Sequence, residues 1–443
     1  MKDTQSAFST GDYKRLSKRI REVAEVSCED YKMLQALRLS YQEPLSKIFK
    51  IINNRAHKLD RNSVCTYRIK RIESIVSKLR RIKTMQVQNM ADVAGCRCIM
   101  TEERSAIDLY NDILKFAEKK SSKITVKVTR DYIRTPKESG YRSIHLEVHL
   151  KSCPSKIIEI QIRSLAQHNW ATLVEISDII YKSELKEFGN KKQPHLYEFH
   201  QLLSKDEGEL TLSDKRRIVK LSGQFKYLET LGKRFSQNIL ELREQRNNLR
   251  TRRHGSYYLI STDEYGAPEI QQFLDLDKAE KCYFKMFVDN SGNKNIVLTH
   301  FTNVSFEKIS IAYSNYVMTY NATLFKILKA IGEVTSADYN NYNLLSFRKH
   351  YKTFWRIITI WFDEKKDEIQ RFASAYRTKS SKSKKKKEWS ISLGRSFLMV
   401  WIIILKMQNQ FKGGLLYLPA SALKRQTDKS FTYIQDLFEE VFN

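Results

Sequence analysis

The sequence predicts an α+β protein in which a mixed sheet with flanking helices is followed by a C-terminal region with a small α/β unit and further helices. Three observations carry this prediction. Short apolar or alternating runs, typical of strands, are interleaved with amphipathic runs between residues 93 and 181. The same mixture returns between residues 256 and 317. Helical periodicities occupy much of the remaining chain, and 443 residues suffice for about two or three domains.

The N-terminal half is expected to contain a helical segment, residues 1–60, and an α+β domain, residues 61–185. Apolar residues recur at helical spacing from residue 12 to residue 58. In the α+β domain, strands are expected at residues 93–100, 124–128, 143–150 and 157–162, and helices at residues 106–117 and 165–181. Pro136 and Gly140 predict a loop at residues 134–140.

The C-terminal half is expected to begin with a helical connector, residues 186–255. Apolar residues recur at intervals of three or four up to Leu242, which predicts one amphipathic helix capped by Ser213. Residues 256–320 form the predicted small unit, with a hairpin at 257–273, a helix from 276 and a strand at 296–301. Residues 321–443 are expected to be helical, with a basic linker at 378–388.

The composition is strongly basic, with a formal net charge of +28. Such a surplus attracts the phosphates of nucleotides or nucleic acids, and here it is spread along the chain rather than confined to one tail. The six cysteines lack zinc-ligand spacing, which indicates reduced thiols in a cytoplasm. The first residues form no apolar signal segment, and the longest apolar run, residues 397–405, is about half of a bilayer span. We therefore expect a cytoplasmic protein without a membrane partner.

One basic cluster and one carboxylate suit a polyphosphate and a metal ion. Lys70, Ser74 and Lys78 recur at four-residue spacing, shortly after Arg68. In a helix this spacing aligns two ammonium groups and a hydroxyl on one face, where they could bind phosphates. Asp92 stands at the entrance to an apolar strand and could hold Mg²⁺, which prefers oxygen ligands. Taken singly, a basic helix face is usually solvated, and such an aspartate is usually a cap or turn residue.

Other polar residues could bind a nucleobase and further phosphates. Arg97 could stack on a base or clamp a phosphate, and Tyr141 offers an aromatic ring. The basic side chains of the adjoining loop are Arg134, Lys137 and Arg142. Alternation from residue 159 to residue 163 places on one face Glu159, Gln161 and Arg163. A lone charged strand face is usually solvent-exposed. Because this face belongs to a sheet that also carries the other polar clusters, it predicts a shared polar cleft.

The order and spacing of these clusters resemble the synthetase domain of RelA/SpoT-family alarmone synthetases, and most of all the small, single-function members. The most specific stretch is residues 159–175, Glu-Ile-Gln-Ile-Arg-Ser-Leu-Ala-Gln-His-Asn-Trp-Ala-Thr-Leu-Val-Glu, and the loop at residues 132–145 is nearly as specific. The resemblance covers about residues 60–185, under a third of the chain. It implies a fold like the DNA polymerase β-type nucleotidyltransferases and the transfer of pyrophosphate from ATP to the 3′-hydroxyl of GDP or GTP.

The resemblance also implies a role for each site residue. The ATP-binding residues would be Arg68 and Arg97 around the adenine, with Lys70, Ser74 and Lys78 on the phosphates. The cofactor would be Mg²⁺, held by Asp92 and Glu159, and Glu159 would also take the proton from the acceptor hydroxyl. The acceptor base would stack on Tyr141. The acceptor pocket would be completed by Lys137, His145, Gln161, Arg163 and His168.

Two residues depart from the family's pattern, and both lie where the acceptor base is expected. Ser139 stands in place of an asparagine, and His168 stands in place of an aspartate or asparagine. These departures leave the implied reaction type unchanged but leave guanine specificity open. His57 is the one histidine before residue 60, so the His/His-Asp metal cluster of the family's hydrolase domain is absent there. The resemblance therefore implies synthesis without built-in degradation.

Three functions stay open at this stage. The first is an alarmone synthetase that uses a guanosine or adenosine nucleotide as acceptor. The second is a toxic relative that pyrophosphorylates the 3′ end of tRNA, which suits the net charge of +28. The third is a non-catalytic nucleotide-binding regulator, against which the presence of both Asp92 and Glu159 argues. The resemblance also suggests a homo-oligomer.

The C-terminal half has three open interpretations: a scaffold, a region that controls the synthetase core, or a docking region for RNA. The predicted helix at 213–242 would couple the two halves, since it joins them and presents one apolar face. Under the control hypothesis, a soluble truncation after residue 190 would change the specific activity by at least about tenfold.

Overall fold

The computed structural model describes residues 8–183, 185, 189–231, 256–262, 268–289, 295–301, 306–313, 315 and 323–341. The chain divides into two compact units. The first unit joins the residues up to 193 to residues 237–321, and the second joins residues 194–236 to the residues from 322 onward. The helices and the basic linker predicted beyond residue 341 lie outside the described residues. Within the described residues, no helix has the length and apolar character needed to cross a membrane.

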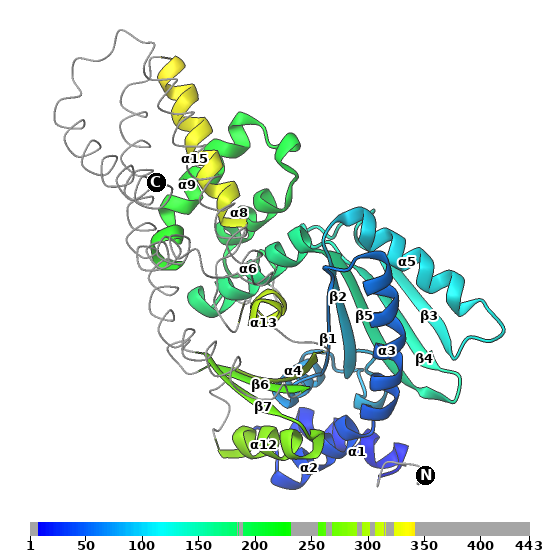
Figure 1. The fold of residues 1–443 in the computed structure, drawn as a ribbon. Helices are drawn as coiled ribbons and strands as arrows, with labels where there is room; N and C mark the ends of the chain where they lie inside the picture. Colours follow the sequence, from blue (N-terminus) through cyan, green and yellow to red (C-terminus); the bar gives the residue numbers. More distant parts are fainter. Residues whose placement is uncertain are drawn as a thin grey trace, which may run out of the picture. The chain divides into compact units, whose positions relative to one another are not determined.

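The first unit is built on an eight-stranded sheet with the order β3-β4-β5-β2-β1-β8-β6-β7 (Figure 1). Strands β2 and β5 pair in parallel, whereas the other pairs along this order are antiparallel. The strands are β1 Val64–Ile69, β2 Ala94–Met100, β3 Ile124–Asp131, β4 Ile144–Leu150, β5 Cys153–Ser164, β6 Tyr257–Thr262, β7 Pro268–Phe273 and β8 Asn295–Phe301. The predicted α+β class with a mixed sheet and flanking helices is therefore confirmed.

Residues 256–320 do not form the separate unit that the sequence predicts. Its hairpin, helix and last strand form as expected, but β8 hydrogen-bonds to β1 and so continues the sheet of the α+β domain. Across this junction the hydroxyls of Thr66 and Thr299 lie 2.6 Å apart. A strand pairs on both sides unless it lies at an edge, and the sequence alone cannot show which distant strand supplies the second partner.

The N-terminal segment is helical as predicted, and it is divided into three helices. These are α1 Thr10–Glu22, α2 Cys28–Leu39 and α3 Gln42–Leu59. Val23 is extended and ends α1, and the side chain of Ser27 then accepts a hydrogen bond from the backbone of Asp30 to begin α2. Such an N-cap satisfies a free N–H group at the start of a helix, so the serine marks a new helix inside a continuous apolar pattern.

The remaining helices of the first unit are α4 Ile72–Arg81, α5 Glu103–Ala117, α6 Leu165–Tyr181, α12 Leu276–Asp289 and α13 Phe306–Ala312, with a 3-10 turn at Val87–Asn89. Helix α6 has the predicted bounds. Ser164 precedes it and forms a capping box with Gln167, so the start of the helix is encoded locally.

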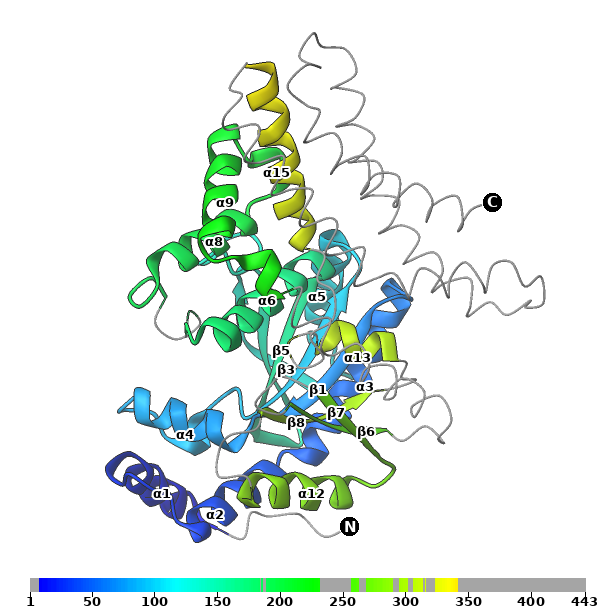
Figure 2. The ribbon, with the colours of Figure 1, turned by 90° about the vertical axis from the view of Figure 1, so that its left-hand side faces the viewer.

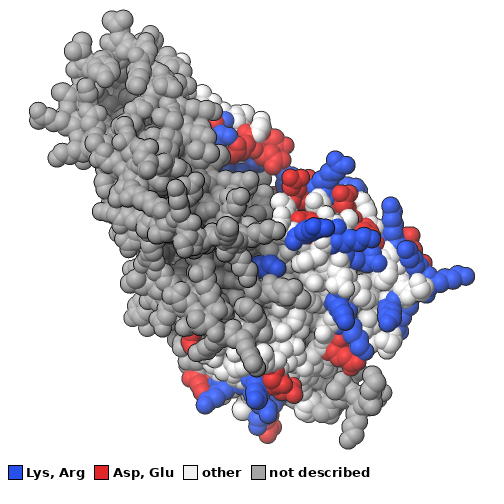
Figure 3. All heavy atoms as spheres, in the orientation of Figure 1, with Lys and Arg blue, Asp and Glu red and all other residues white. Residues whose placement is uncertain are grey.

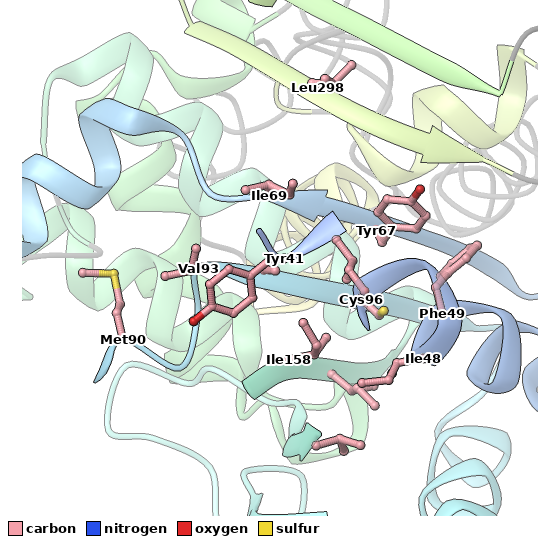
Figure 4. Packing of buried hydrophobic residues seen from close by; sticks show 14 of the residues in the cluster. Tyr41, Ile48, Phe49, Tyr67, Ile69, Met90, Val93, Cys96, Ile158 and Leu298 are labelled. Carbon is pink, nitrogen blue, oxygen red and sulfur yellow. The ribbon is translucent and has the colours of Figure 1, made fainter. Parts of the chain in front are cut away.

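One face of the sheet packs on the main apolar core. The opposite face, called the polar face below, carries polar residues beside a second, smaller apolar cluster that includes Val64, Ile99 and Ala312 of α13. On the apolar face, α3, α5 and α12 pack on side chains from alternate strand positions. Figure 4 shows Ile48 and Phe49 of α3 beside Tyr67 and Cys96 of the sheet, and the rings of Phe49 and Tyr67 lie 4.9 Å apart. Strand alternation therefore sends the intervening residues to the opposite face, where α6 and α13 lie (Figure 2).

The second unit contains the helices α8 Pro194–Ser204, α9 Leu212–Gln224 and α15 Thr323–Asn340, with a 3-10 turn at Glu207–Glu209. The single helix predicted from Ser213 to Leu242 is wrong. Thr211, not Ser213, caps α9, and Lys226 has a left-handed φ of 48° that breaks the helix after Gln224. Arg216 of α9 forms an ion pair with the buried Asp338 of α15, with an N–O distance of 2.5 Å.

Candidate active site

Polar residues from four neighbouring strands gather on the polar face of the sheet. Arg68 of β1 lies opposite Gly95 of β2, which in turn lies opposite Glu159 of β5. A Cβ atom on Gly95 would lie 2.9 Å from the backbone oxygen of Glu159, so a glycine is needed for this close approach. In the next row, Gln161 lies between Arg97 of β2 and His145 of β4. The register thus brings the predicted ATP-binding and acceptor-binding residues onto one surface.

The side of this surface nearest α4 holds Asp92 between two lysines. The Nζ of Lys70 lies 2.9 Å from Oδ2 of Asp92, and the Nζ of Lys78 lies 2.7 Å from Oδ1. The predicted helical face of Lys70, Ser74 and Lys78 is partly wrong, because α4 begins only at Ile72. Lys70 lies in the turn before α4, Arg68 lies in β1, and the two lysines converge on Asp92 from different elements.

Burial and the two lysines shift the pKa of Asp92 in opposite directions. Burial raises the pKa of its carboxyl, but Lys70 and Lys78 outweigh this effect, so the pKa lies below its ordinary value. Burial in turn lowers the pKa of Lys70, although Asp92 opposes that shift. We conclude that Asp92 is ionised near neutral pH and that its negative charge is shared between two ammonium groups.

A chain of hydrogen bonds runs through the second carboxylate, Glu159. His145 Nδ1 donates to Oε1 of Glu159 over 3.0 Å, since an ionised carboxylate can only accept. Gln161 Nε2 donates to Oε2 over 2.9 Å, and the hydroxyl of Tyr141 lies 2.8 Å from Nε2 of His145. Burial raises the pKa of Glu159, but the hydrogen bonds from His145 and Gln161 outweigh it, so the pKa lies below its ordinary value.

The loop that precedes β4 adds an aromatic pair and a cation. The rings of Tyr132 and Tyr141 lie 6.2 Å apart, and Lys137 Nζ lies 4.5 Å from the ring centre of Tyr132 and 5.4 Å from that of Tyr141. Gly140 has a φ of 88°, which turns the chain ahead of Tyr141. Tyr132 was not among the predicted site residues, although its aromatic character and its place in the same loop were a usable signal.

Two predicted site residues are bound by α13. Arg97 Nη1 donates to the carbonyl of Ala312 over 3.1 Å, and His168 Nε2 donates to the carbonyl of Ile311 over 2.6 Å. Burial, together with the nearby Arg163, lowers the pKa of Arg97 to about 10. Burial also lowers the pKa of His168 well below its ordinary value, so His168 is neutral. These contacts with α13 are not predicted from the sequence, because residues 256–320 were expected to form a separate unit.

A third carboxylate lies beside the site but is already paired. Glu147 of β4 lies directly opposite Glu159, and its Oε1 accepts from Arg130 over 2.8 Å. Among the described residues, no group of three or more metal-binding side chains is present. Asp92 and Glu159 are close enough for the charge of Asp92 to raise the pKa of Glu159. Two such carboxylates fit Mg²⁺, which commonly uses one or two carboxylates together with substrate phosphates and water.

The fold and the site define a class of protein by its features: a mixed sheet bearing paired carboxylates, converging lysines and an aromatic loop. Residues 67–186 match the family model described as the region found in RelA/SpoT proteins. This stretch is therefore a RelA/SpoT region, and the predicted resemblance is confirmed. It contains all the site residues described above except the α13 carbonyls.

Curated relatives match the same part of the chain. The chain is 39% identical over 129 residues to the GTP pyrophosphokinase YjbM of Bacillus subtilis, covering 28% of this chain and 59% of that protein. It is 38% identical over 116 residues to the GTP pyrophosphokinase YwaC of the same organism, covering 24% and 53%. The chain thus spans between 53% and 59% of the length of these relatives.

Solved structures of small alarmone synthetases are also similar. Synthetase 1 of Bacillus subtilis, bound to its product pppGpp, is 24% identical with a TM-score of 0.31, covering 45% of this chain and 99% of the other. Synthetase 2 of the same organism is 26% identical with a TM-score of 0.29, covering 37% and 87%.

Proposed function

We propose that this protein transfers a pyrophosphoryl group from ATP to the 3′-hydroxyl of GDP or GTP. The observation that carries the proposal is the hydrogen-bonded chain Tyr141–His145–Glu159 beside the Lys70–Asp92–Lys78 cluster. The first group suits an acceptor hydroxyl, and the second suits a polyphosphate donor. The names of the curated relatives, GTP pyrophosphokinases, support the same reaction.

On the donor side of the site, basic residues would neutralise the negative charge of the ATP phosphates. Lys70 and Lys78 would exchange part of their contact with Asp92 for the phosphates of ATP, with Ser74 one turn before Lys78 on α4. Arg68 would stack on the adenine, and Arg97 would join it once its bond to Ala312 is released. Fixed cations of this kind stabilise the charge that develops on the transferred group.

The metal is part of the proposal. Asp92 and Glu159 would hold Mg²⁺, since both are ionised and lie on adjoining parts of the polar face. When bound, Mg²⁺ neutralises phosphate charge and favours departure of the leaving group. The lysines around Asp92 would keep its charge balanced before ATP arrives.

The acceptor side activates an alcohol. Glu159 would take the proton of the 3′-hydroxyl while the 3′-oxygen bonds to the β-phosphorus of ATP and the bond from that phosphorus to the α,β-bridging oxygen breaks, releasing AMP. His145 holds Glu159 in orientation through a 3.0 Å hydrogen bond. A positioned base of this type contributes about 10²- to 10⁴-fold to the rate. Tyr141 would stack on the acceptor base.

A second candidate acceptor is the 3′ end of tRNA. The net charge of +28 favours an RNA. Figure 3 shows Lys and Arg distributed over the described surface on the face in view. His168 stands where the family has Asp or Asn. Its Nε2 donates to a carbonyl of α13 and is therefore not free to bind a guanine base.

The test is an acceptor panel. Purified protein is incubated with Mg²⁺, labelled ATP and one of GDP, GTP, ADP or bulk tRNA, and the products are resolved. We expect a 3′-pyrophosphorylated guanosine nucleotide and AMP. Labelled tRNA alone would favour the second candidate, and the absence of product with every acceptor would favour a non-catalytic nucleotide-binding protein.

A further inference from the structure

The turn that carries Lys70 is held by hydrogen bonds to three separate parts of the chain. The N–H of Lys70 donates to the carbonyl of Val93 over 2.7 Å. The carbonyl of Lys70 accepts from Nε of Arg38 in α2 over 2.9 Å. The N–H of Ile72 donates to the hydroxyl of Tyr283 in α12 over 3.2 Å. The position of Lys70 therefore depends on α2 and α12 as well as on the sheet.

The hydroxyl of Tyr283 substitutes for a missing helix cap. The first N–H groups of a helix have no partner within the helix. The side chain of the N-cap residue of α4, Arg71, does not cap the helix, whereas Tyr283 accepts from Ile72 at the first position of the helix. Helix α4 carries Ser74 and Lys78, so α12 caps the helix that presents two residues of the proposed ATP-phosphate site.

A buried ion pair joins α12 to the same turn. Arg38 and Glu280 are 1% and 5% exposed, and Arg38 Nη1 lies 3.2 Å from Oε2 of Glu280. Gln35 donates to the same carboxylate oxygen over 2.9 Å, and the guanidinium carbon of Arg38 lies 4.3 Å from the ring centre of Tyr283. A buried charge that loses its partner is strongly unfavourable. Glu280 therefore holds Arg38 in the orientation that reaches the carbonyl of Lys70.

We propose that α12 is a working part of the ATP-phosphate site and that Glu280 and Tyr283 are positioning residues for Lys70 and α4. This inference rests on the proposed function. Neither residue lies in the RelA/SpoT region at 67–186, so the donor site would be completed by a segment far downstream in the sequence. Because α12 is continuous with the sheet through β7 and β8, it is fixed to the same unit as the site.

The test uses Tyr283→Phe, which removes the hydroxyl and keeps the ring over Arg38. The binding of a non-hydrolysable ATP analogue with a methylene between the α- and β-phosphates is measured by calorimetry with Mg²⁺. We expect a loss of affinity of about fivefold, the size of one hydrogen bond. The acceptor KM should stay within about twofold, a change too small to represent a lost contact. Hydrogen exchange should show faster exchange of the amide of Ile72.

A matched control comes from the same pair of helices. The ring of Tyr31 in α2 lies edge-on to Phe287 of α12 with centres 4.9 Å apart, whereas the N–H of Ile72 donates to the hydroxyl of Tyr283. Tyr31→Phe should leave analogue binding and the exchange of Ile72 unchanged. Glu280→Gln provides a second variant, and it should weaken the binding of ATP more than that of the acceptor.

Three outcomes overturn the inference. One is analogue binding by Tyr283→Phe within about twofold of wild type, less than a hydrogen bond predicts. Another is an equal loss for ATP and acceptor that follows the loss of thermal stability. A third is a wild-type protein that does not bind the analogue. Because the analogue is bound without turnover, a protein that shows the expected pattern but forms no product contradicts the proposed function and supports the positioning role.

Discussion

At Glu159, strands β4 and β5 supply the groups that hold one carboxylate. Both of its oxygens accept hydrogen bonds, from His145 and Gln161, and its neighbour across the β4–β5 ladder is Glu147. We expect Glu159→Gln and Asp92→Asn each to retain less than about a tenth of wild-type turnover, because each removes a group that acts on the transition state. Initial rates with ATP and the preferred acceptor check this.

Glu147→Gln is the matched control for that prediction. It removes a carboxylate from the adjacent position of the same sheet face, where Glu147 is paired with Arg130. Its turnover should stay close to that of wild type. An equal loss in Glu147→Gln and Glu159→Gln would show that the sheet face needs charge in general rather than a base at Glu159.

Tyr141 combines two contacts that can be separated. Its ring lies in the aromatic loop, and its hydroxyl lies 2.8 Å from His145. Tyr141→Ala should raise the acceptor KM more than the ATP KM, since base stacking contributes roughly 1–3 kcal/mol. Tyr141→Phe keeps the ring and should therefore lower kcat with a smaller effect on the acceptor KM. Equal effects of Tyr141→Ala on both substrates would identify Tyr141 as a packing residue.

His300 makes the stability of the first unit depend on pH. It lies in β8, its ring stacks on Tyr67 with centres 4.6 Å apart, and burial lowers its pKa from 6.5 to about 4. The unfolded state therefore binds a proton below pH 6.5 that the folded state does not bind until about pH 4. The free energy of unfolding should fall as the pH drops through this window, by at most about 1.4 kcal/mol per pH unit.

Chemical denaturation at several pH values measures this dependence. His300→Phe keeps an aromatic ring beside Tyr67 and should remove the contribution, giving a smaller slope between pH 6.5 and 4. An unchanged slope in the variant would contradict the assignment to His300.

At the scale of elements, α13 lies over the proposed adenine site. Its carbonyls hold Arg97 and His168, and the hydroxyl of Tyr313 that follows it donates to Thr299 over 2.6 Å. Tyr313→Phe removes this hydrogen bond, whose net value is about 1 kcal/mol. If ATP must displace the end of α13 to reach Arg97, the variant should bind ATP more tightly, by up to about fivefold. Weaker ATP binding would indicate instead that α13 supports the site.

Local sequence signals predicted the bounds of helices and strands more completely than the pairing of strands that are distant in sequence. Helix α6 has its predicted bounds because Ser164 and Gln167 encode its start, and β2 starts within one residue of its prediction because its apolar run is short and bounded. The pairing of β1 with β8 was not predicted, because residues 66 and 299 are distant in sequence and no local pattern reports their contact. The break in α9 at Lys226 was also missed, since its apolar periodicity continues past the left-handed residue.

The candidate site shows the same division. Glu159, Gln161 and Arg163 could be placed on one strand face from alternation, and the structure confirms that face. Lys70 was expected on a helix with Lys78 but lies in a turn, because the helical spacing continues upstream of the first helical residue, Ile72. Contacts to α12 and α13 could not be foreseen, since they follow from the long-range pairing of the sheet.

At the scale of the whole molecule, the continuous eight-stranded sheet changes the expected effect of truncation. Removing everything after residue 190 would delete β6, β7 and β8 and expose the edge of β1. Exposed strand edges promote aggregation. We therefore expect this truncation to be insoluble or aggregated by size-exclusion chromatography, rather than soluble with altered activity. A monodisperse truncation with wild-type kinetics would show that the sheet does not depend on its C-terminal strands.

The most direct test follows the two transferred phosphorus atoms. Wild-type protein and Glu159→Gln are incubated with GDP, Mg²⁺ and ATP labelled at either the β- or the γ-phosphorus, and the nucleotides are separated. A pyrophosphoryl transfer predicts that both labels appear on the 3′ side of the guanosine product, with equal yield, and that AMP is unlabelled. Glu159→Gln should give almost no product. Transfer of the γ-label alone, or equal product from both proteins, would contradict the account.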